Sequence, residues 1–265
     1  MPPRTTSKGS QKWRGAARDT RPMLATLTDP QLHEQVLRRS DLVFEPKYDG
    51  IRAVIDIDPT PRVRIYSRLG NDKTEQFPEI VEPLNRFGRR LSAPIVVDGE
   101  LVAVDDDGQP LGFQHLQGRL HLRGLTSHSA SRAASVAFIA FDLLKEGDKD
   151  LRTSSFSVRR ERLTTLFRRP GSKMLRLIDS RLGGGMRLRA TAKRRGWEGI
   201  IAKEPHSRYV SGKRHSAWQK LKFVKTEEFV VGGWTEPRQS RNHFGALLLG
   251  YYRENGSKGD RLIFM

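Results

Sequence analysis

The stretch Glu45-Pro46-Lys47-Tyr48-Asp49-Gly50-Ile51-Arg52 decides how this sequence is interpreted. It places a lysine just before an Asp-Gly pair, with an arginine two residues after the glycine. A lysine amine is a nucleophile only without its extra proton, and neighbouring cations and loss of water favour that form. The pattern alone is equally compatible with a solvent-facing lysine before an ordinary turn. The rest of the chain must therefore decide whether Lys47 is reactive.

Five further short motifs follow along the chain, and their residue types suit the transfer of a nucleotide. They are Ser67-Arg68-Leu69-Gly70, Asp98-Gly99-Glu100, Phe141-Asp142-Leu143-Leu144, Glu198-Gly199-Ile200-Ile201-Ala202-Lys203 and Trp218-Gln219-Lys220-Leu221-Lys222. Lys220 and Lys222 alternate on a predicted strand, so both project from one face and can meet phosphates. Glu100 and Glu198 are carboxylates available to a divalent cation, which takes one or two carboxylates together with phosphate oxygens and water.

The composition points to a polyanionic partner. The chain has 265 residues and a formal net charge of +18, and such an excess of Lys and Arg favours binding to nucleic acid through release of counterions. It contains no cysteine, which excludes disulfides and thiolate metal sites. No stretch has the apolar length of a membrane span and no secretory signal is present, so we expect a cytoplasmic protein without a membrane partner.

Hydrophobic periodicity predicts a mixed α and β protein in three segments. Residues 1–21 are basic and poor in apolar side chains, which predicts a disordered arm. Residues 22–223 contain a predicted hairpin over 52–67, further strands over 95–104, 136–144, 199–202 and 218–223, and helices over 75–90, 157–167 and 186–195, the second of them capped by Ser157. Three short strands with glycine-rich turns are predicted within residues 224–265.

In this order, the six motifs resemble those of ATP-dependent DNA ligases, most closely the ligase module of bacterial end-joining ligase D. The resemblance implies that Lys47 is adenylated. It also implies that the nucleotide is bound by Glu45, Arg52, Arg68, Glu100, Phe141, Lys220 and Lys222. A magnesium or manganese ion would be held by Glu100 and Glu198, and Arg68 would also contact the DNA at the nick.

The resemblance further implies an α+β fold: an antiparallel-sheet nucleotidyltransferase domain of the ATP-grasp-like ligase adenylation type, followed by an OB-fold β-barrel. Arg238 and Arg241 would contact DNA phosphates there. Only 42 residues (265 − 223) follow Phe223, enough for about three of the five barrel strands. We therefore expect a partial, truncated barrel. The family's last motif, a basic segment used in self-adenylation, has no match.

The function expected from the resemblance is ATP-dependent sealing of nicks or ends in duplex DNA during repair, in a bacterial, nucleoid-associated setting. ATP and Mg²⁺ (or Mn²⁺) are the expected cofactors. The expected partners are nicked or broken duplex DNA and an end-binding protein of the Ku type. Two alternatives remain open at this point: a nucleotidyltransferase acting on RNA ends or caps, and a truncated, non-catalytic DNA-binding protein.

Overall fold

The computed structural model describes residues 17–120, 135–223, 229–237, 244–253 and 261–264, and it divides into two compact units, Met1–Phe223 and Val224–Met265. Each unit is described by itself below. Arg238 and Arg241, which we expect to contact DNA, lie outside the described residues. Within the described ranges, no helix is long and apolar enough to cross a lipid bilayer.

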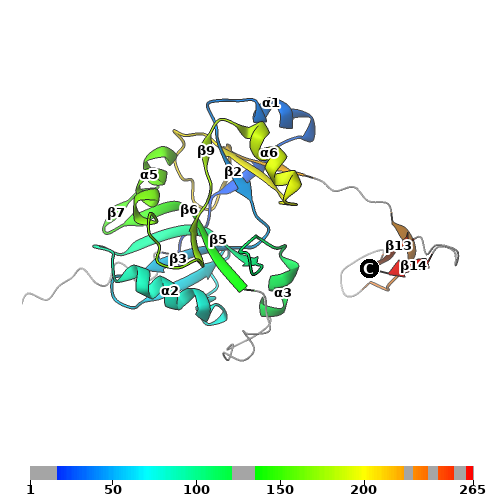
Figure 1. The fold of residues 1–265 in the computed structure, drawn as a ribbon, viewed down its shortest axis with the longest axis horizontal. Helices are drawn as coiled ribbons and strands as arrows, with labels where there is room; N and C mark the ends of the chain where they lie inside the picture. The colour runs from blue at the N-terminus through cyan, green and yellow to red at the C-terminus, as the bar shows by residue number, and fades with distance from the viewer. Residues whose placement is uncertain (1–16, 121–134, 224–228, 238–243, 254–260, 265) are drawn as a thin grey trace, which may run out of the picture. The chain divides into compact units, whose positions relative to one another are not determined.

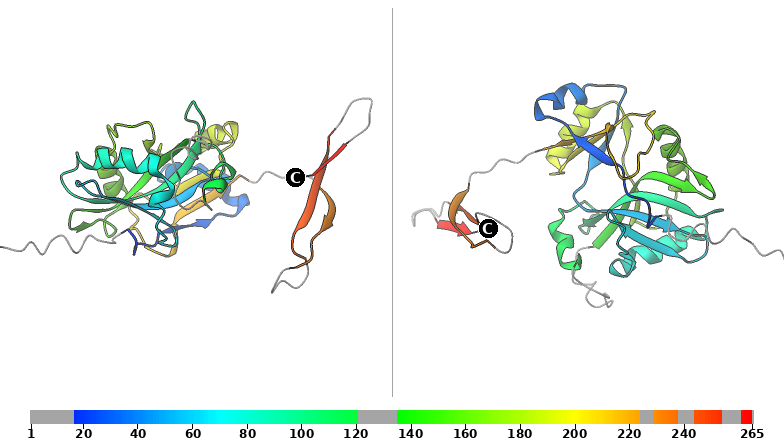
Figure 2. Two further views of the ribbon diagram at one scale, coloured as in Figure 1. Left: turned by 90° about the horizontal axis from the view of Figure 1, so that it is seen from below. Right: turned by 180° about the vertical axis from the view of Figure 1, so that it is seen from behind.

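Two sheets form the frame of the first unit (Figures 1 and 2). The five-stranded sheet contains, in spatial order, β1 (Leu24–Leu27), β11 (Arg214–Lys222), β10 (Gly199–Lys203), β2 (Val43–Lys47) and β9 (Arg181–Leu182). The six-stranded sheet has the path β4 (Val63–Ser67), β3 (Ile51–Ile57), β5 (Ile95–Val104), β6 (Ser135–Glu146) and β7 (Lys149–Asp150), with β8 (Leu175–Leu177) beside β6. Pairing is antiparallel except for β1 with β11 and β6 with β8, which are parallel.

Short helices connect these strands. They are the 3₁₀ helices η1 (Pro30–Leu32) and η2 (Thr74–Gln76) and the α-helices α1 (His33–Leu37), α2 (Pro78–Gly88), α3 (Gln114–Leu120), α5 (Phe156–Leu166) and α6 (Gly185–Arg194). The predicted hairpin, the long strands and the three main helices are therefore confirmed, with α2 shorter than expected. Pro83 is tolerated inside α2, where it is buried.

The core is built in layers by the alternation of the strands. In β3 and β5, Ile55, Ile57 and Val97 point to one face, where α2 and α5 cover a large apolar cluster (Figure 1). Val54 and Val96 point to the opposite face, toward a cluster that includes Trp218 of the other sheet. Successive side chains of a strand face opposite sides of a sheet. Polar residues at the even positions of β3 and β5 therefore face the space between the two sheets.

Helix α5 is attached to β6 by a fully buried ion pair. Arg159 donates from Nε to Oδ1 of Asp142 at 2.7 Å and from Nη2 to Oδ2 at 2.9 Å, and both side chains are fully buried. The N-cap of α5 is Ser155, which accepts a hydrogen bond from the backbone N–H of Val158. The prediction of Ser157 as the cap is wrong, because its hydroxyl instead donates to the carbonyl of Pro205.

Replacing Arg159 with lysine should lower the free energy of unfolding by about 1–3 kcal/mol, because an ammonium cannot make the two parallel hydrogen bonds of a guanidinium. The loss should appear as a lower midpoint in urea unfolding. Arg162→Lys is the matched control: Arg162 pairs with Glu146 at 2.5 Å but is 43% exposed. An equal loss of unfolding free energy in Arg159→Lys and Arg162→Lys would show that burial does not make the Arg159–Asp142 pair more stabilising than the exposed one.

The described residues of the predicted arm are packed onto the domain. Ala17 is fully buried, and its backbone N–H donates to Oδ1 of Asp56 at 3.1 Å. The prediction of disorder is therefore wrong for residues 17–21. The segment contains basic residues, but the small side chain of Ala17 packs into the apolar cluster that contains Tyr66 and Trp218. Residues 1–16 lie outside the described ranges.

Burial raises the pKa of Asp56 to about 7. The folded protein then holds a proton that the unfolded chain loses near pH 4, so the free energy of unfolding falls as the pH rises from about 4 to about 7. We expect Asp56→Asn to match the parent at pH 4 and to be more stable at pH 8 by about 1–3 kcal/mol. Urea unfolding at the two pH values tests this, with the exposed Asp107→Asn as control. A constant difference between parent and variant would contradict it.

The described part of the second unit is a three-stranded antiparallel sheet. Its order is β12 (Val230–Trp234), β13 (Leu247–Arg253) and β14 (Arg261–Phe264). The three strands predicted within residues 224–265 are therefore present. Several large apolar side chains of this unit are exposed, among them Val231, Trp234 and Leu248.

Candidate active site

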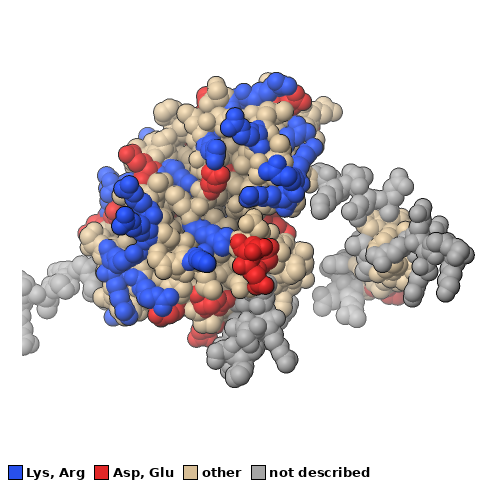
Figure 3. All heavy atoms as spheres, viewed as in Figure 1, with Lys and Arg blue, Asp and Glu red and all other residues tan. Residues whose placement is uncertain are grey.

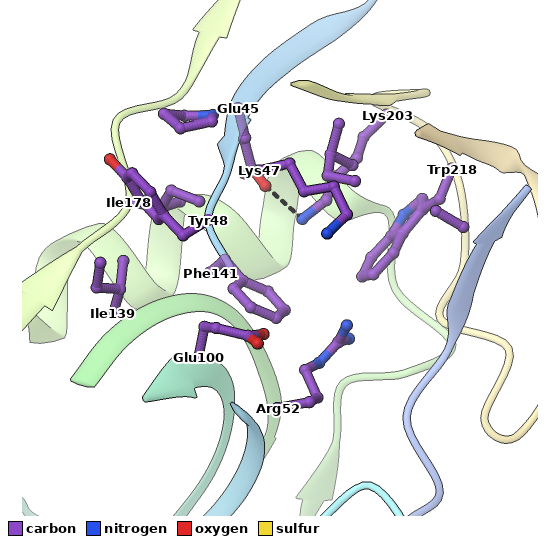
Figure 4. Close-up of a pocket in the computed structure, with 13 residues that line it drawn as sticks. Glu45, Lys47, Tyr48, Arg52, Glu100, Ile139, Phe141, Ile178, Lys203 and Trp218 are labelled. Atoms are coloured by element: carbon purple, nitrogen blue, oxygen red, sulfur yellow. Dashed lines mark ion pairs between the residues drawn. The ribbon is translucent and has the colours of Figure 1, made fainter. Parts of the chain in front are cut away.

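A pocket between the two sheets collects most of the residues singled out in the sequence (Figure 4). Its lining includes Glu45, Lys47, Arg52, Glu100 and Phe141. Strands β2, β10 and β11 bury Phe44, Ile200 and Leu221 against α1 and α6, so their alternate residues face the pocket. The six-stranded sheet contributes residues from β3, β5 and β6. The site is therefore formed where the inward-facing residues of the two sheets meet.

Lys47 stands at the end of β2 and forms an ion pair with Glu198, just before β10. Lys47 and Gly199 are direct partners in the antiparallel pairing of β2 with β10, which explains why Glu198 reaches the amine. Glu198 also binds Lys222, whose Nζ lies 2.7 Å from Oε1. Although burial opposes its ionisation, hydrogen bonds from Lys222 and Lys47 hold the pKa of Glu198 below its ordinary value. One carboxylate therefore bridges two cations.

Lys220 and Lys222 share one face of β11, as predicted, because Leu221 between them is fully buried on the other face. The two amines differ electrostatically. Loss of water and the nearby charges of Arg214, Lys222 and Lys47 lower the pKa of Lys220. The hydrogen bond to Glu198 raises the pKa of Lys222. The cations that we expected around Lys47 are thus present, but its direct partner is a carboxylate.

Asp98 organises the floor of the site and was not singled out as a site residue from the sequence. Its fully buried carboxylate accepts hydrogen bonds from Nε and Nη2 of Arg52 at 2.6 and 2.7 Å and from the Tyr209 hydroxyl at 2.5 Å. Burial disfavours the Arg52 cation, but the Asp98 charge outweighs this and raises the pKa of Arg52. The guanidinium lies 4.5 Å from the ring centre of Phe141. Arg52 is therefore fixed between an acid and an aromatic face.

Glu45 and Lys203 form a second buried pair at the pocket wall. Nζ of Lys203 lies 2.6 Å from Oε2 of Glu45, and both side chains are 2% exposed. The ammonium also lies 4.9 Å and 4.1 Å from the ring centres of Phe141 and Trp218. Oε1 of Glu45 is buried and has no hydrogen-bond partner in the described part of the chain. Sequence reasoning did not single out Lys203 as a site residue, although its place at the end of the motif Glu198-Gly199-Ile200-Ile201-Ala202-Lys203 was a usable signal.

Glu100 projects from β5 into the pocket (Figure 4). Burial raises its pKa to about 7, against the opposing charges of Arg52 and Lys47. In the described ranges, no group of three or more His, Cys, Asp or Glu side chains could hold a metal by itself. The carboxylates of Glu100 and Glu198 fit only a cation that takes its other ligands from phosphate oxygens and water.

Arg68 stands apart from this assembly. It is exposed in the turn after β4 and does not line the pocket, so the structure does not bring it together with the other predicted nucleotide-binding residues.

Gly50 is packed tightly against the site. A Cβ atom there would lie 2.3 Å from the carbonyl oxygen of Leu101 and 2.9 Å from Cγ of Glu100. The absence of a side chain at Gly50 allows residues 48–50, which connect β2 to β3, to approach β5 this closely.

Comparison with known proteins is consistent with this geometry. Residues 22–222 match the family described as ATP dependent DNA ligase domain. The chain is 36% identical over 214 residues to the multifunctional non-homologous end joining protein LigD of Pseudomonas aeruginosa, covering 81% of this chain and 24% of that protein. It is 33% identical over 223 residues to DNA ligase C of Mycobacterium tuberculosis, covering 82% of this chain and 60% of that protein.

Solved structures agree with the sequence comparison. The crystal structure of the ligase domain of M. tuberculosis LigD is similar with a TM-score of 0.62 and 31% identity, covering 93% of this chain and 72% of that one. A mycobacterial DNA ligase D complexed with ATP and MES gives a TM-score of 0.63 and 32% identity, covering 92% and 71%. The chain spans about a quarter of the length of the LigD proteins that it matches.

Proposed function

This chain belongs to the family of ATP-dependent DNA ligases, and from that premise we propose that it joins breaks in duplex DNA through an AMP group carried on Lys47. The observation that supports this most is the environment of the Lys47 amine. It lines a pocket with Glu45, Arg52, Glu100 and Phe141 and is held by Glu198. An amine held beside further cations and carboxylates is suited to attack a nucleotide phosphate.

In the first proposed step, the Lys47 ammonium gives one proton to water, and its neutral Nζ attacks the α phosphorus of ATP and releases a second proton to water. A P–N bond forms, the bond from that phosphorus to the bridging oxygen breaks, and pyrophosphate leaves. Lys220 and Lys222 suit the charge that develops on the phosphates. Glu45 suits the adenine base, since its buried Oε1 makes no hydrogen bond in the described part of the chain, with Arg160 Nη1 4.0 Å away, and can accept one. Phe141 offers the adenine an aromatic face.

Two transfers complete the proposed reaction. An oxygen of the 5′ phosphate at the break attacks the AMP phosphorus, and the P–N bond to Lys47 breaks as Nζ takes up a proton from water. The 3′ hydroxyl then attacks the activated 5′ phosphate and loses its proton, and AMP leaves as the phosphodiester forms. Glu100 and Glu198 would hold a magnesium or manganese ion, which supplies positive charge at the phosphates when it is bound.

The biological setting is part of the proposal. Relatives whose names include non-homologous end joining support a role in break repair, with a Ku-type end-binding protein as a candidate partner. We also propose that strands β12 to β14 belong to an OB-fold that contacts DNA, and that Arg68, Arg238 and Arg241 contribute DNA contacts. A three-stranded antiparallel sheet is consistent with part of such a barrel.

A joining assay tests the proposed function. The full chain, ATP and magnesium are incubated with a labelled duplex carrying one nick, and sealed strands and protein-bound AMP are measured separately. We expect both products from DNA. Sealing of nicked RNA but not DNA would favour the alternative acceptor, and salt-dependent DNA binding without any lysine adenylate would favour a non-catalytic binding protein. Either result would overturn the proposal.

A further inference from the structure

A second cavity, which we call the arginine pocket, opens beside the candidate active site. Its volume is about 460 Å³, and it is lined by β9, the residues before α6 and one face of α6. Trp197 lines this cavity, whereas Tyr48 lines the first one, and the two rings meet edge to face with 5.3 Å between their centres. A pair of aromatic rings therefore separates the two cavities.

Four arginines surround the arginine pocket: Arg181, Arg187, Arg194 and Arg195. All four are exposed. Among the described residues, no carboxylate lies within 4.0 Å of the last three, and Asp179 lies 3.5 Å from Arg181. Four arginines and the single Asp179 leave a formal charge of +3 on the lining (4 − 1). Figure 3 shows Lys and Arg side chains gathered over this part of the molecule, where α6 lies.

The arginines are arranged along the helix in a way that suits several phosphates. Arg187, Thr191 and Arg194 recur at helical spacing on one face of α6, and the seven steps along the helix from Arg187 to Arg194 span about 10 Å at 1.5 Å per residue. Arg195 lies over the Trp197 ring, 5.5 Å from its centre, which holds its guanidinium beside the cavity. Guanidinium groups bind phosphate oxygens through paired hydrogen bonds. A row of them fits a polyphosphate chain better than a single ion.

We propose that the arginine pocket is a second phosphate site, which binds the phosphodiester backbone of a DNA strand next to the nucleotide pocket. The inference rests on the proposed function, because DNA is its ligand. A strand held there contacts the surface immediately beside the Tyr48 and Trp197 pair. The same chemistry would also accept a free polyphosphate such as pyrophosphate, so the test must separate these two sources.

The test measures binding of a fluorescent nicked duplex to the full chain by anisotropy between 50 and 200 mM salt. The double variant Arg187→Gln/Arg194→Gln removes two pocket charges. We expect its Kd at 50 mM salt to rise at least about 10-fold, and the slope of log K against log salt to become shallower by about 1–2, since each phosphate contact contributes about 0.9. The matched control Arg62→Gln/Arg168→Gln removes two exposed charges that do not line the pocket. Its Kd should change less than about 3-fold.

Two further measurements keep the outcomes distinct. Lysine adenylate formation with ATP should stay within about 2-fold of the parent in both double variants, because none of these arginines lines the nucleotide pocket. A parent protein without any adenylate would refute the proposed function, while the DNA titration would still report on this site. Equal loss of DNA affinity in both double variants would overturn the inference. So would calorimetry in which the pocket variant loses pyrophosphate binding but keeps its DNA affinity.

Discussion

Replacing Lys47 with alanine should abolish the covalent AMP adduct, a loss of at least about 10³-fold in initial rate, because the nucleophile is gone. The adduct is detected by incubating the protein with α-labelled ATP and separating it on a denaturing gel. Alanine also leaves Glu198 with only one of its two cationic partners, Lys222. A second substitution is therefore needed to separate loss of the nucleophile from loss of the charge.

Lys47→Arg is that control. Arginine keeps a cation beside Glu198, but it does not lose its proton in proteins and cannot act as the nucleophile. We expect no adduct from this variant, although ATP binding measured by equilibrium dialysis should stay within about 10-fold of the parent. Lys222→Gln, which also removes a partner of Glu198, should still be labelled at a reduced rate. Full labelling of either Lys47 variant would remove this residue from the role.

Replacing Asp98 with alanine should produce the second large effect, because one buried carboxylate holds two other groups. Without it, the Arg52 guanidinium and the Tyr209 hydroxyl lose partners at 2.6 and 2.5 Å. Removing one member of a buried ion pair leaves an uncompensated charge and costs about 3–5 kcal/mol of the free energy of unfolding. Released from Asp98, Arg52 should also leave its place against Phe141. We expect adduct formation to fall by at least about 100-fold at a temperature where the variant is folded.

Tyr209→Phe provides the matched comparison for Asp98→Ala. It removes one hydrogen bond to the same carboxylate but leaves the ion pair with Arg52 intact. The expected cost in the free energy of unfolding is about 1 kcal/mol, since a neutral partner contributes less than a charged one. Urea unfolding and the gel assay are run on both variants. If Asp98→Ala matched Tyr209→Phe in both the free energy of unfolding and the rate of adduct formation, a positioning role for Asp98 would be contradicted.

The sequence by itself determined the local features of this protein. The alternation of apolar and polar residues in 52–67 was sufficient to predict β3 and β4, because side chains of a strand alternate between two faces, and the strand-like stretch 95–104 predicted β5. The motif order was sufficient to identify the family. It also identified Lys47, Arg52, Glu100 and Phe141, which share one pocket.

The N-terminal boundary and the cap of α5 were not predictable in the same way. Each depends on a contact with a residue that is far away in the sequence. Ala17 is buried because Asp56, 39 residues away, accepts its backbone N–H. Ser157 is diverted from capping because the Pro205 carbonyl lies beside it. Local propensity does not contain these partners.

Only the tertiary structure decided how the site is connected. Alternation says which face of a strand a residue occupies, but the register between strands decides what it meets. The pairing of β2 with β10 brings Glu198 to Lys47 across 151 positions, and packing brings the Tyr209 hydroxyl to Asp98 across 111. The arginine pocket likewise exists only because β9 packs beside the arginine-bearing face of α6. Such contacts depend on the closure of long loops, and no short stretch of sequence encodes them.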